Sequence, residues 1–430
     1  MTPDAPLSAR PSRARLRTVA LIWLGWAMVM LAYQSFAQAR LPLLRPDHAT
    51  TFSAQETGTD SLRGRPYLDG GGLLRSHVAW DSQYYLSIAL HGYDDPTMPA
   101  VSPTSTSAAP MSGPQKLHPT WTAINYAYFP AYPMAIRTVA APLRLAGLAP
   151  AAAATLAGVL ISLVGALGAA LAIFDLASED DPLEGIRAGV YLLIWPAAAF
   201  LTQVYTEGLF IGLSFGALAM LRRRRWVWAA ALAVFATWTR ANGALLLLPF
   251  VWTWMADGGL DRLRTREGRR GAVATLVLAG APALAYLVWR ILLGARFEYV
   301  EGHYFGRGMF ALAASYKALL DTLDLVRSGD PQAGAYYAAE AVSVVAAVTC
   351  SAFLWRRDKA LALYGLAIVG VAMTSGAELG FPRYVLAVPA LFLVPARWGR
   401  NMVFDRVWSL ANGLGLAVWT LAFSFGFWDG

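Results

Sequence analysis

Four short groups of polar residues in this apolar chain combine carboxylates with arginines, and the first group is residues 76–95. There Asp81 stands beside Trp80, where a carboxylate could act as a general base that accepts the proton of a hydroxyl group. The alternative is structural: Asp81 caps the start of a short helix, with Ser82 helping. The residue types alone leave both interpretations open.

The second and third groups would place opposite charges in two successive turns. Glu207 follows a tyrosine and a threonine in one turn, and Arg240 and Asn242 belong to the sequence TRANG in the next. A carboxylate at membrane depth is costly, so Glu207 indicates either a functional site or a partner for a nearby arginine.

The fourth group, residues 378–384, carries Glu378, Arg383 and Tyr384. Arg240 and Arg383 both fall on the face that we predict to be external. A bound phosphate would compensate their charge, because the planar guanidinium group matches phosphate oxygens. The alternative is an ion pair, Arg240 with Glu207 or Arg383 with Glu378.

Other polar residues carry weaker signals. The aromatic residues of NYAYFPAYP (125–133) predict an interfacial belt, with the lining of a sugar site as the alternative. Asp94 and Asp95 resemble paired metal-binding carboxylates, although we expect a solvated loop end. The histidines show no metal-ligand spacing, so we expect no zinc site.

The elements that must position these residues are membrane helices. The chain is 57% hydrophobic and 14% charged, whereas soluble domains are about 45–50% apolar and about 25% charged. Residues 151–174 contain no charge and exceed the roughly 20 residues that a membrane-spanning helix needs.

Because the basic residues crowd the ends of apolar runs, the net charge of +8 indicates membrane orientation and no nucleic-acid partner. The single cysteine, Cys350, excludes a disulfide scaffold.

We therefore expect one all-α polytopic membrane domain. Residues 1–17 would form a cytoplasmic basic tail, 18–39 the first transmembrane helix, 40–150 an external loop, and 151–430 a transmembrane helical bundle. Further spans are predicted at about 151–174, 188–202, 205–221, 226–239, 243–256, 272–293, 336–355, 360–376, 384–396 and 403–425. With about eleven spans the N-terminus is cytoplasmic, and more than half of the 35 basic residues fall in short cytoplasmic segments.

The external loop is expected to contain amphipathic helices. Residues 80–93 predict a short helix that ends at Gly92, and residues 131–147 predict a helix lying in the membrane interface. The stretch 96–119 is rich in Pro, Ser and Thr and predicts a flexible loop.

Taken in order, these stretches resemble the PIG-V family, the second mannosyltransferase of GPI-anchor assembly, and its bacterial relatives. The matching stretches are WDSQYYLSIALHGY (80–93), YFPAYPMAIR (128–137), YTEGLF (205–210) followed by RRRRW (222–226), TRANG (239–243) and PRYVLAVPALFL (382–393). Their order and spacing match over roughly residues 76–395. Abundant Ala, Gly and Arg indicate a bacterial member, for which the GPI acceptor cannot be carried over.

The resemblance implies a GT-C glycosyltransferase on the extracytoplasmic face of the cell membrane. Its donor would be a polyprenyl-phosphate sugar, with mannose expected, and its acceptor an unknown glycan, lipid or protein. No cofactor is expected to be obligatory, although a divalent metal is possible. In this family an acidic residue of the first external loop usually occupies the catalytic position, which is Asp81 here.

The expected mechanism inverts the anomeric carbon, with Asp81 as general base and with Arg383 and Arg240 on the donor phosphate. Eight further residues are expected to position the sugar or the acceptor: Trp80, Tyr84, Tyr85, Tyr93, Tyr128, Glu207, Asn242 and Tyr384.

Two other functions stay open on the sequence. The outer arginines could bind cargo in a transporter or flippase of a lipid-linked sugar or anion, and a non-catalytic scaffold subunit would need none of the polar residues. The absence of an internal repeat and the external loop that carries Trp80 and Asp81 favour the enzyme.

Overall fold

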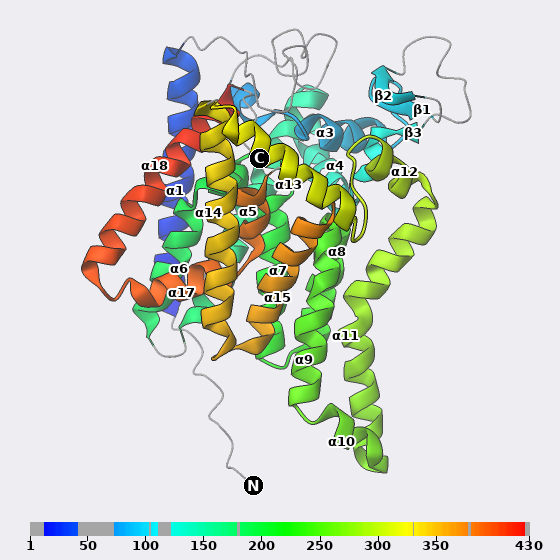
Figure 1. Cartoon of the computed structure of the whole chain (residues 1–430), viewed down its shortest axis with the longest axis vertical. Helices are drawn as coiled ribbons and strands as arrows, with labels where there is room; N and C mark the ends of the chain where they lie inside the picture. Colours follow the sequence, from blue (N-terminus) through cyan, green and yellow to red (C-terminus); the bar gives the residue numbers. More distant parts are fainter. Residues whose placement is uncertain are drawn as a thin grey trace.

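Helices make up most of this chain, as a computed structural model of residues 13–41, 73–102, 105–110, 122–178, 181–329, 331–376 and 380–425 shows (Figure 1). The first helices, with η denoting a 3-10 helix, are α1 (Arg13–Arg40), η2 (Leu73–His77), α3 (Ser82–His91), η4 (Ile124–Ala127), α4 (Ala131–Leu145), α5 (Pro150–Ala177), α6 (Pro182–Ile194), η5 (Pro196–Thr202) and α7 (Glu207–Arg222). The later helices are α8 (Trp226–Thr239), η6 (Ala241–Leu246), α9 (Leu247–Ala256), α10 (Gly259–Arg264), α11 (Arg266–Leu293), α12 (Arg296–His303), α13 (Leu312–Arg327), α14 (Pro331–Trp355), α15 (Lys359–Thr374), α16 (Phe381–Tyr384), η7 (Val385–Ala387), α17 (Ala390–Trp398) and α18 (Met402–Ser424).

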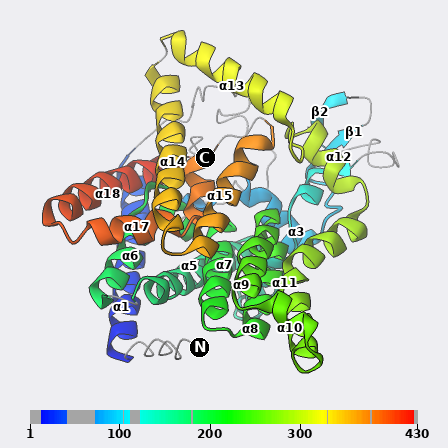
Figure 2. The same cartoon turned by 60° about the horizontal axis from the view of Figure 1, so that its bottom comes forward.

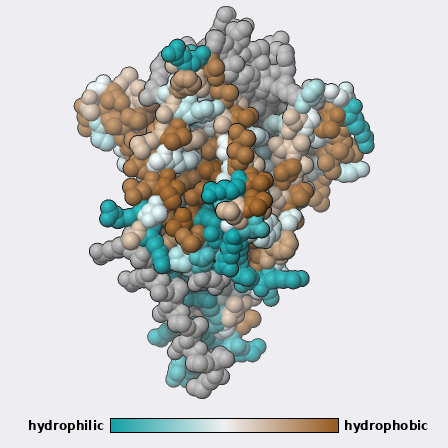
Figure 3. All heavy atoms as spheres, turned by 90° about the vertical axis from the view of Figure 1, so that its left-hand side faces the viewer, coloured by the Kyte–Doolittle hydropathy of each residue, from teal (hydrophilic) through white to brown (hydrophobic). Residues whose placement is uncertain are grey.

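Five of the described helices are long and apolar enough to cross a membrane, or six if the bent pair α6–η5 is one span. The five are Ala14–Arg40, Pro150–Ala177, Arg266–Leu293, Gly334–Trp355 and Met402–Ser424. Apolar side chains cover a broad area of the face that carries α1 and α18 (Figure 3), and Val407, Leu410 and Leu414 of α18 are exposed there. The chain is a multi-pass membrane protein.

Two of the expected spans are not continuous helices. In the span expected at 188–202, α6 and η5 meet at an angle of 79°. In the span expected at 384–396, the chain passes from η7 to α17 through Val388 and Pro389. In both cases the residue before the proline, Trp195 (ψ 139°) or Val388 (ψ 103°), has left the helical region, because the proline ring disfavours that conformation in its predecessor.

A small sheet accompanies the expected helical bundle. Strands β1 (Pro99–Ser102), β2 (Ser105–Pro110) and β3 (Thr122–Ala123) form an antiparallel sheet in the order β2-β1-β3. Ala100 and Val101 are fully buried, so part of the predicted flexible loop 96–119 folds because apolar residues interrupt its polar composition. Residues 111–121 lie outside the described part of the chain.

The helices α12 and α13 were not expected from the sequence either. Figures 1 and 2 both show α13 running across the direction of α14, and none of its residues is buried. Its composition mixes leucines with charged residues, which weakens the signal of a spanning helix.

Close packing of α5 on α7 fixes the start of α7. A Cβ atom at Gly208 would collide with the backbone of Ser162, and one at Gly212 would collide with the backbone of Gly165. Small residues at such positions let two membrane helices approach backbone to backbone. The contact therefore holds Glu207, the first residue of α7, close to α5.

A buried polar junction connects α1 and α18 with the segment before α7. The Gln34 side-chain amide donates to the Ser76 carbonyl at 3.3 Å, to Gln203 Oε1 at 3.2 Å and to Ser424 Oγ at 3.2 Å. All four residues are buried, so leaving their polar groups unpaired would cost free energy.

The helix expected at 80–93 is α3, which ends at Gly92 with φ 91°. Arg137 of α4 closes it by donating from Nε to the Ala89 carbonyl at 2.7 Å and from Nη2 to the Ile88 carbonyl at 3.0 Å. The neighbouring side chains of Tyr126, Phe129 and Tyr132 are buried inside the protein, so the interpretation of 125–133 as an interfacial belt is wrong.

Candidate active site

Asp81 and Arg383 meet at one end of the bundle although 302 residues separate them. Arg383 Nη1 lies 3.4 Å from Asp81 Oδ2, and the Tyr128 hydroxyl donates to Asp81 Oδ1 at 3.0 Å. The backbone N–H of Asp81 donates to the Tyr205 hydroxyl at 3.1 Å. The Asp81 side chain makes no capping hydrogen bond to α3, so the interpretation of Asp81 as a helix cap is wrong.

Glu207 lies between the two arginines that the sequence singled out. Its Oε1 forms an ion pair with Arg240 Nη1 and lies 3.2 Å from Arg383 Nε. The predicted alternative of an Arg240–Glu207 pair is therefore confirmed. Arg383 pairs with Asp81 and Glu207, while Glu378, the partner suggested for it, lies outside the described residues.

Burial differs sharply between the two carboxylates. The Glu207 side chain is 3% exposed, whereas that of Asp81 is 22% exposed. Asp81 is thus the carboxylate that an acceptor could reach from solvent, and Glu207 is enclosed by the guanidinium groups. The hydrogen bonds between these carboxylates and the guanidinium groups join two charged partners and are therefore stronger than neutral ones.

The Arg383 guanidinium is nearly enclosed by protein, and one of its N–H donors has no hydrogen-bond acceptor among the described residues. Burial acts to lower the pKa of Arg383, but the carboxylates of Glu207 and Asp81 outweigh it and raise that pKa above its ordinary value. The Nε–H, although within ion-pair distance of Glu207, has no aligned hydrogen-bond acceptor among the described residues. A buried donor without an acceptor is costly, and an additional anionic oxygen could satisfy it.

Aromatic rings surround the charged cluster. The Arg383 guanidinium carbon lies 5.5 Å from the ring centroids of both Phe200 and Tyr205 and 5.8 Å from that of Tyr384. The Tyr384 ring also lies 5.3 Å from the guanidinium carbon of Arg240. Such contacts hold a cation in place where few waters reach it.

The tyrosines of α3 pack on Tyr128. Tyr84 stacks on it at 4.8 Å between ring centroids, and Tyr85 meets it edge-on at 5.0 Å. Burial and the nearby Asp81 carboxylate raise the pKa of both Tyr85 and Tyr128. Both therefore stay protonated, and Tyr128 remains a hydrogen-bond donor to Asp81.

Three further expected residues make contacts of other kinds. The Tyr93 hydroxyl donates to the Tyr128 carbonyl at 3.0 Å, and its ring stacks on Tyr126. Trp80 has a left-handed backbone with φ 48° and packs against the core cluster. Asn242 lies in η6 and forms no hydrogen bond with the described part of the cluster. The structure thus gathers most of the predicted set, and among the described residues Asn242 makes no hydrogen bond to it.

Glu340 belongs to the site and was missed by sequence reasoning. Its two carboxylate oxygens accept the backbone N–H groups of Gly380 and Phe381, each at 2.7 Å. These groups begin α16, which carries Arg383. A glutamate inside the apolar run 336–355 is the signal that could have found it, since carboxylates within spans are rare.

The paired acids after α3 are structural groups. Asp95 is buried and accepts from the Ser87 hydroxyl at 2.7 Å and from the Thr97 N–H at 2.9 Å. Asp94 accepts from the Tyr126 hydroxyl at 2.9 Å. The expectation of a solvated loop end is therefore wrong for Asp95, because polar neighbours within ten residues fold over it.

No group of three His, Cys, Asp or Glu residues that could hold a metal occurs within the described ranges. Cys350 is a buried free thiol.

Residues 119–277 match the family model described as Mannosyltransferase (PIG-V). This range contains Tyr128, Glu207 and Arg240 but neither Asp81 nor Arg383. The chain is similar to proteins named GPI alpha-1,6-mannosyltransferase 2. It is 30% identical to the Mus musculus protein over 216 residues, or 49% of this chain and 38% of that protein.

Two further relatives carry the same name. The Cricetulus griseus protein is 31% identical over 48% of this chain and 37% of its own length, and the Homo sapiens protein is 31% identical over 40% and 30%. The chain thus spans less than two fifths of the length of these relatives. Among solved structures, arabinosyltransferase EmbB from Mycobacterium smegmatis aligns with a TM-score of 0.37 and 14% identity, over 98% of this chain and 46% of that one.

Proposed function

We propose that this chain is a GT-C glycosyltransferase of the PIG-V type that transfers mannose from a polyprenyl-phosphate donor to a hydroxyl group of an acceptor. The contact of Arg383 with both Asp81 and Glu207 carries the proposal, because it joins a reachable carboxylate to buried cations. The match of residues 119–277 to the mannosyltransferase model supports the sugar.

Asp81 acts as the general base in this mechanism. Its exposed carboxylate takes the proton of the acceptor hydroxyl, and the freed oxygen attacks the anomeric carbon from the side opposite the phosphate. The bond between that carbon and the phosphate oxygen breaks, and the lipid phosphate leaves with the electron pair. One displacement of this kind inverts the anomeric carbon.

The arginines stabilise the leaving phosphate. Arg383 offers an Nε–H that has no aligned hydrogen-bond acceptor among the described residues, and Arg240 shares the carboxylate partner of Arg383. Negative charge that develops on the phosphate is therefore met by two preformed cations. The leaving group is a phosphate monoester and needs no general acid, in contrast to the two carboxyl groups of glycoside hydrolysis. Glu207 keeps the two guanidinium groups together before the donor binds.

The cluster lies at the end of the bundle where α7 begins and α8 ends. We place this end on the extracytoplasmic side, since the basic segments Arg222–Arg225 and Arg356–Lys359 follow the opposite ends of α7 and α14. The full count of about eleven spans requires the bent pair α6–η5, the short helices α7, α8, α9 and α15, and the broken segment that ends in α17 to cross as well. Helices of that length are tolerated where they border other helices or a water-filled cavity.

The decisive experiment combines purified protein, polyprenyl-phosphate mannose and an extract of envelope lipids and glycans. In Asp81→Asn we expect transfer to fall by about 10²–10⁴-fold while binding of the donor is retained. Asp94→Asn, which removes a carboxylate from the same loop, serves as the control and should transfer normally. Unchanged transfer by Asp81→Asn would exclude Asp81 as the base, and donor movement across vesicles without transfer would favour a flippase.

A further inference from the structure

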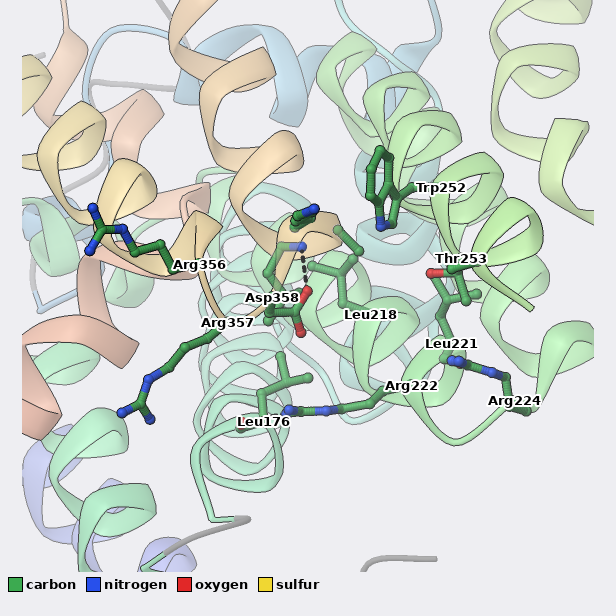
Figure 4. Close-up of a pocket in the computed structure, with 14 residues that line it drawn as sticks. Leu176, Leu218, Leu221, Arg222, Arg224, Trp252, Thr253, Arg356, Arg357 and Asp358 are labelled. Carbon is green, nitrogen blue, oxygen red and sulfur yellow. Dashed lines mark hydrogen bonds between the residues drawn. The ribbon is translucent and has the colours of Figure 1, made fainter. Parts of the chain in front are cut away.

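A second charged site lies at the opposite end of α7. Glu207 is the first residue of this 16-residue helix and Arg222 is its last, so about 24 Å of helix separates the two ends. At the Arg222 end, a cavity of about 490 Å³ opens between the ends of α5, α7 and α9 and the connection from α14 to α15 (Figure 4). Small-molecule sites commonly have volumes of about 300–1,000 Å³.

Five cations line this cavity, and they come from two segments of the chain: Arg222 and Arg224 from one, and Arg356, Arg357 and Lys359 from the other. The lining contains one carboxylate, Asp358, which accepts the Leu361 N–H at 3.0 Å and so caps α15. Figure 4 shows the labelled arginines on several sides of Asp358. The charge around the cavity is therefore strongly positive.

Two of these cations have no carboxylate partner. Arg224 forms an ion pair with Asp257 at 2.6 Å, but neither Arg356 nor Lys359 forms a salt bridge with any residue that the structure describes. Lys359 Nζ instead lies 5.6 Å from the ring centroid of Trp252. Both side chains are exposed, so they can turn to a ligand at the mouth of the cavity.

The cavity also has an apolar part. Leu176, Leu218 and Leu221 line it and are 3%, 2% and 2% exposed. Basic residues at the ends of membrane helices are common, but here five of them border a hollow that buried leucines also line. The Arg356 and Arg357 side chains extend away from the leucines (Figure 4). A cationic mouth above an apolar floor suits an amphiphile with a phosphate group.

We propose that this cavity binds a phosphate group, and that its natural source is the headgroup of an anionic phospholipid in the leaflet opposite the proposed active site. Basic pockets between membrane helices bind such headgroups. The cations supply the charge, and the leucines contact the first carbons of the lipid.

Native mass spectrometry of the full-length protein in neutral detergent tests this proposal. The probes are phosphatidylglycerol, phosphatidylcholine and inorganic phosphate. We expect phosphatidylglycerol to bind more tightly than phosphatidylcholine, and the double variant Arg356→Gln/Lys359→Gln to lose about 30-fold in its affinity, at about 1 kcal/mol for each cation.

Two further variants serve as controls. Arg269→Gln/Arg270→Gln removes two exposed charges from nearby α11 without touching the cavity and should bind as the wild type does. Lys359→Arg keeps the charge and should also bind normally. Equal binding of inorganic phosphate and the lipid, with the same loss in the double variant, would assign a free phosphate to the site. Equal binding of both lipids, or an unaffected double variant, would overturn the proposal.

Discussion

Arg383 contacts Asp81 and Glu207 with different atoms of one guanidinium group, Nη1 at 3.4 Å and Nε at 3.2 Å. The exposed and the buried carboxylate are thereby held on two edges of a single planar cation. Removal of this group would separate the base from the phosphate-binding residues and leave buried Glu207 with one ion-pair partner among the described residues, Arg240.

Arg383→Lys tests this geometry. Lysine keeps the charge, but its single ammonium group cannot reproduce the planar fork. We expect transfer to fall by about 10²-fold, as when one stabilising donor is lost, with weaker binding of the donor. Arg137→Lys is the matched control, because it changes an arginine that contacts α3 carbonyls outside the charged cluster. Equal activity of Arg383→Lys and wild type would contradict the proposed role in phosphate binding.

Glu340→Gln tests the support of Arg383. A glutamine can accept only one of the two N–H groups that the carboxylate now accepts, so α16 should shift and the free energy of unfolding should fall by about 1–3 kcal/mol. Because Glu340 acts through Arg383, we expect a higher KM for the donor with a smaller change in KM for the acceptor. A stability loss with unchanged kinetics would make Glu340 purely structural.

His77 should make the stability depend on pH. Burial lowers its pKa below the ordinary value of about 6.5, and its Nδ1 lies 2.9 Å from the Thr202 carbonyl. Between the lowered pKa and about 6.5 the unfolded chain binds more protons than the folded chain, so stability falls as the pH drops through this window, by about 1.4 kcal/mol per pH unit.

His77→Asn supplies the test, since asparagine keeps a donor for the Thr202 carbonyl but does not titrate. Thermal unfolding between pH 5 and 7.5 should show a smaller pH dependence in the variant than in the wild type. The exposed His303 provides the control, because His303→Asn should leave the pH dependence unchanged.

Gly208→Ala should disturb the contact that holds Glu207. A methyl group at this position meets the backbone of Ser162, which cannot move aside as a side chain would, so we expect a loss of about 1–3 kcal/mol in stability together with reduced transfer. Gly370→Ala in α15 adds the same methyl group where no atom lies within 4 Å. Both variants gain the same helix propensity, so a lower unfolding temperature of Gly208→Ala than of Gly370→Ala would report the packing conflict alone. Equal unfolding temperatures would contradict the packing argument.

The sequence predicted a helix correctly where the residues of that helix alone carry the signal. The uninterrupted apolar run 151–174 and the stretch 80–93 with its terminal glycine both form the expected helices, because hydrophobicity and glycine conformation act over a few neighbouring residues. The breaks at Trp195 and Val388 had a local signal too, in the prolines that follow them.

The arrangement of charges depended on the tertiary structure. The sequence alone placed Asp81, Glu207, Arg240 and Arg383 among the candidates, since ionisable residues are conspicuous in an apolar chain. The sequence offered the Arg240–Glu207 pair as one alternative. That Arg383 pairs with Asp81 and Glu207, that Asp81 is not a cap, and that Glu340 supports α16 became visible only where segments far apart in the chain come together. Packing of side chains between distant helices decides such pairings, and spacing along one chain carries no record of it.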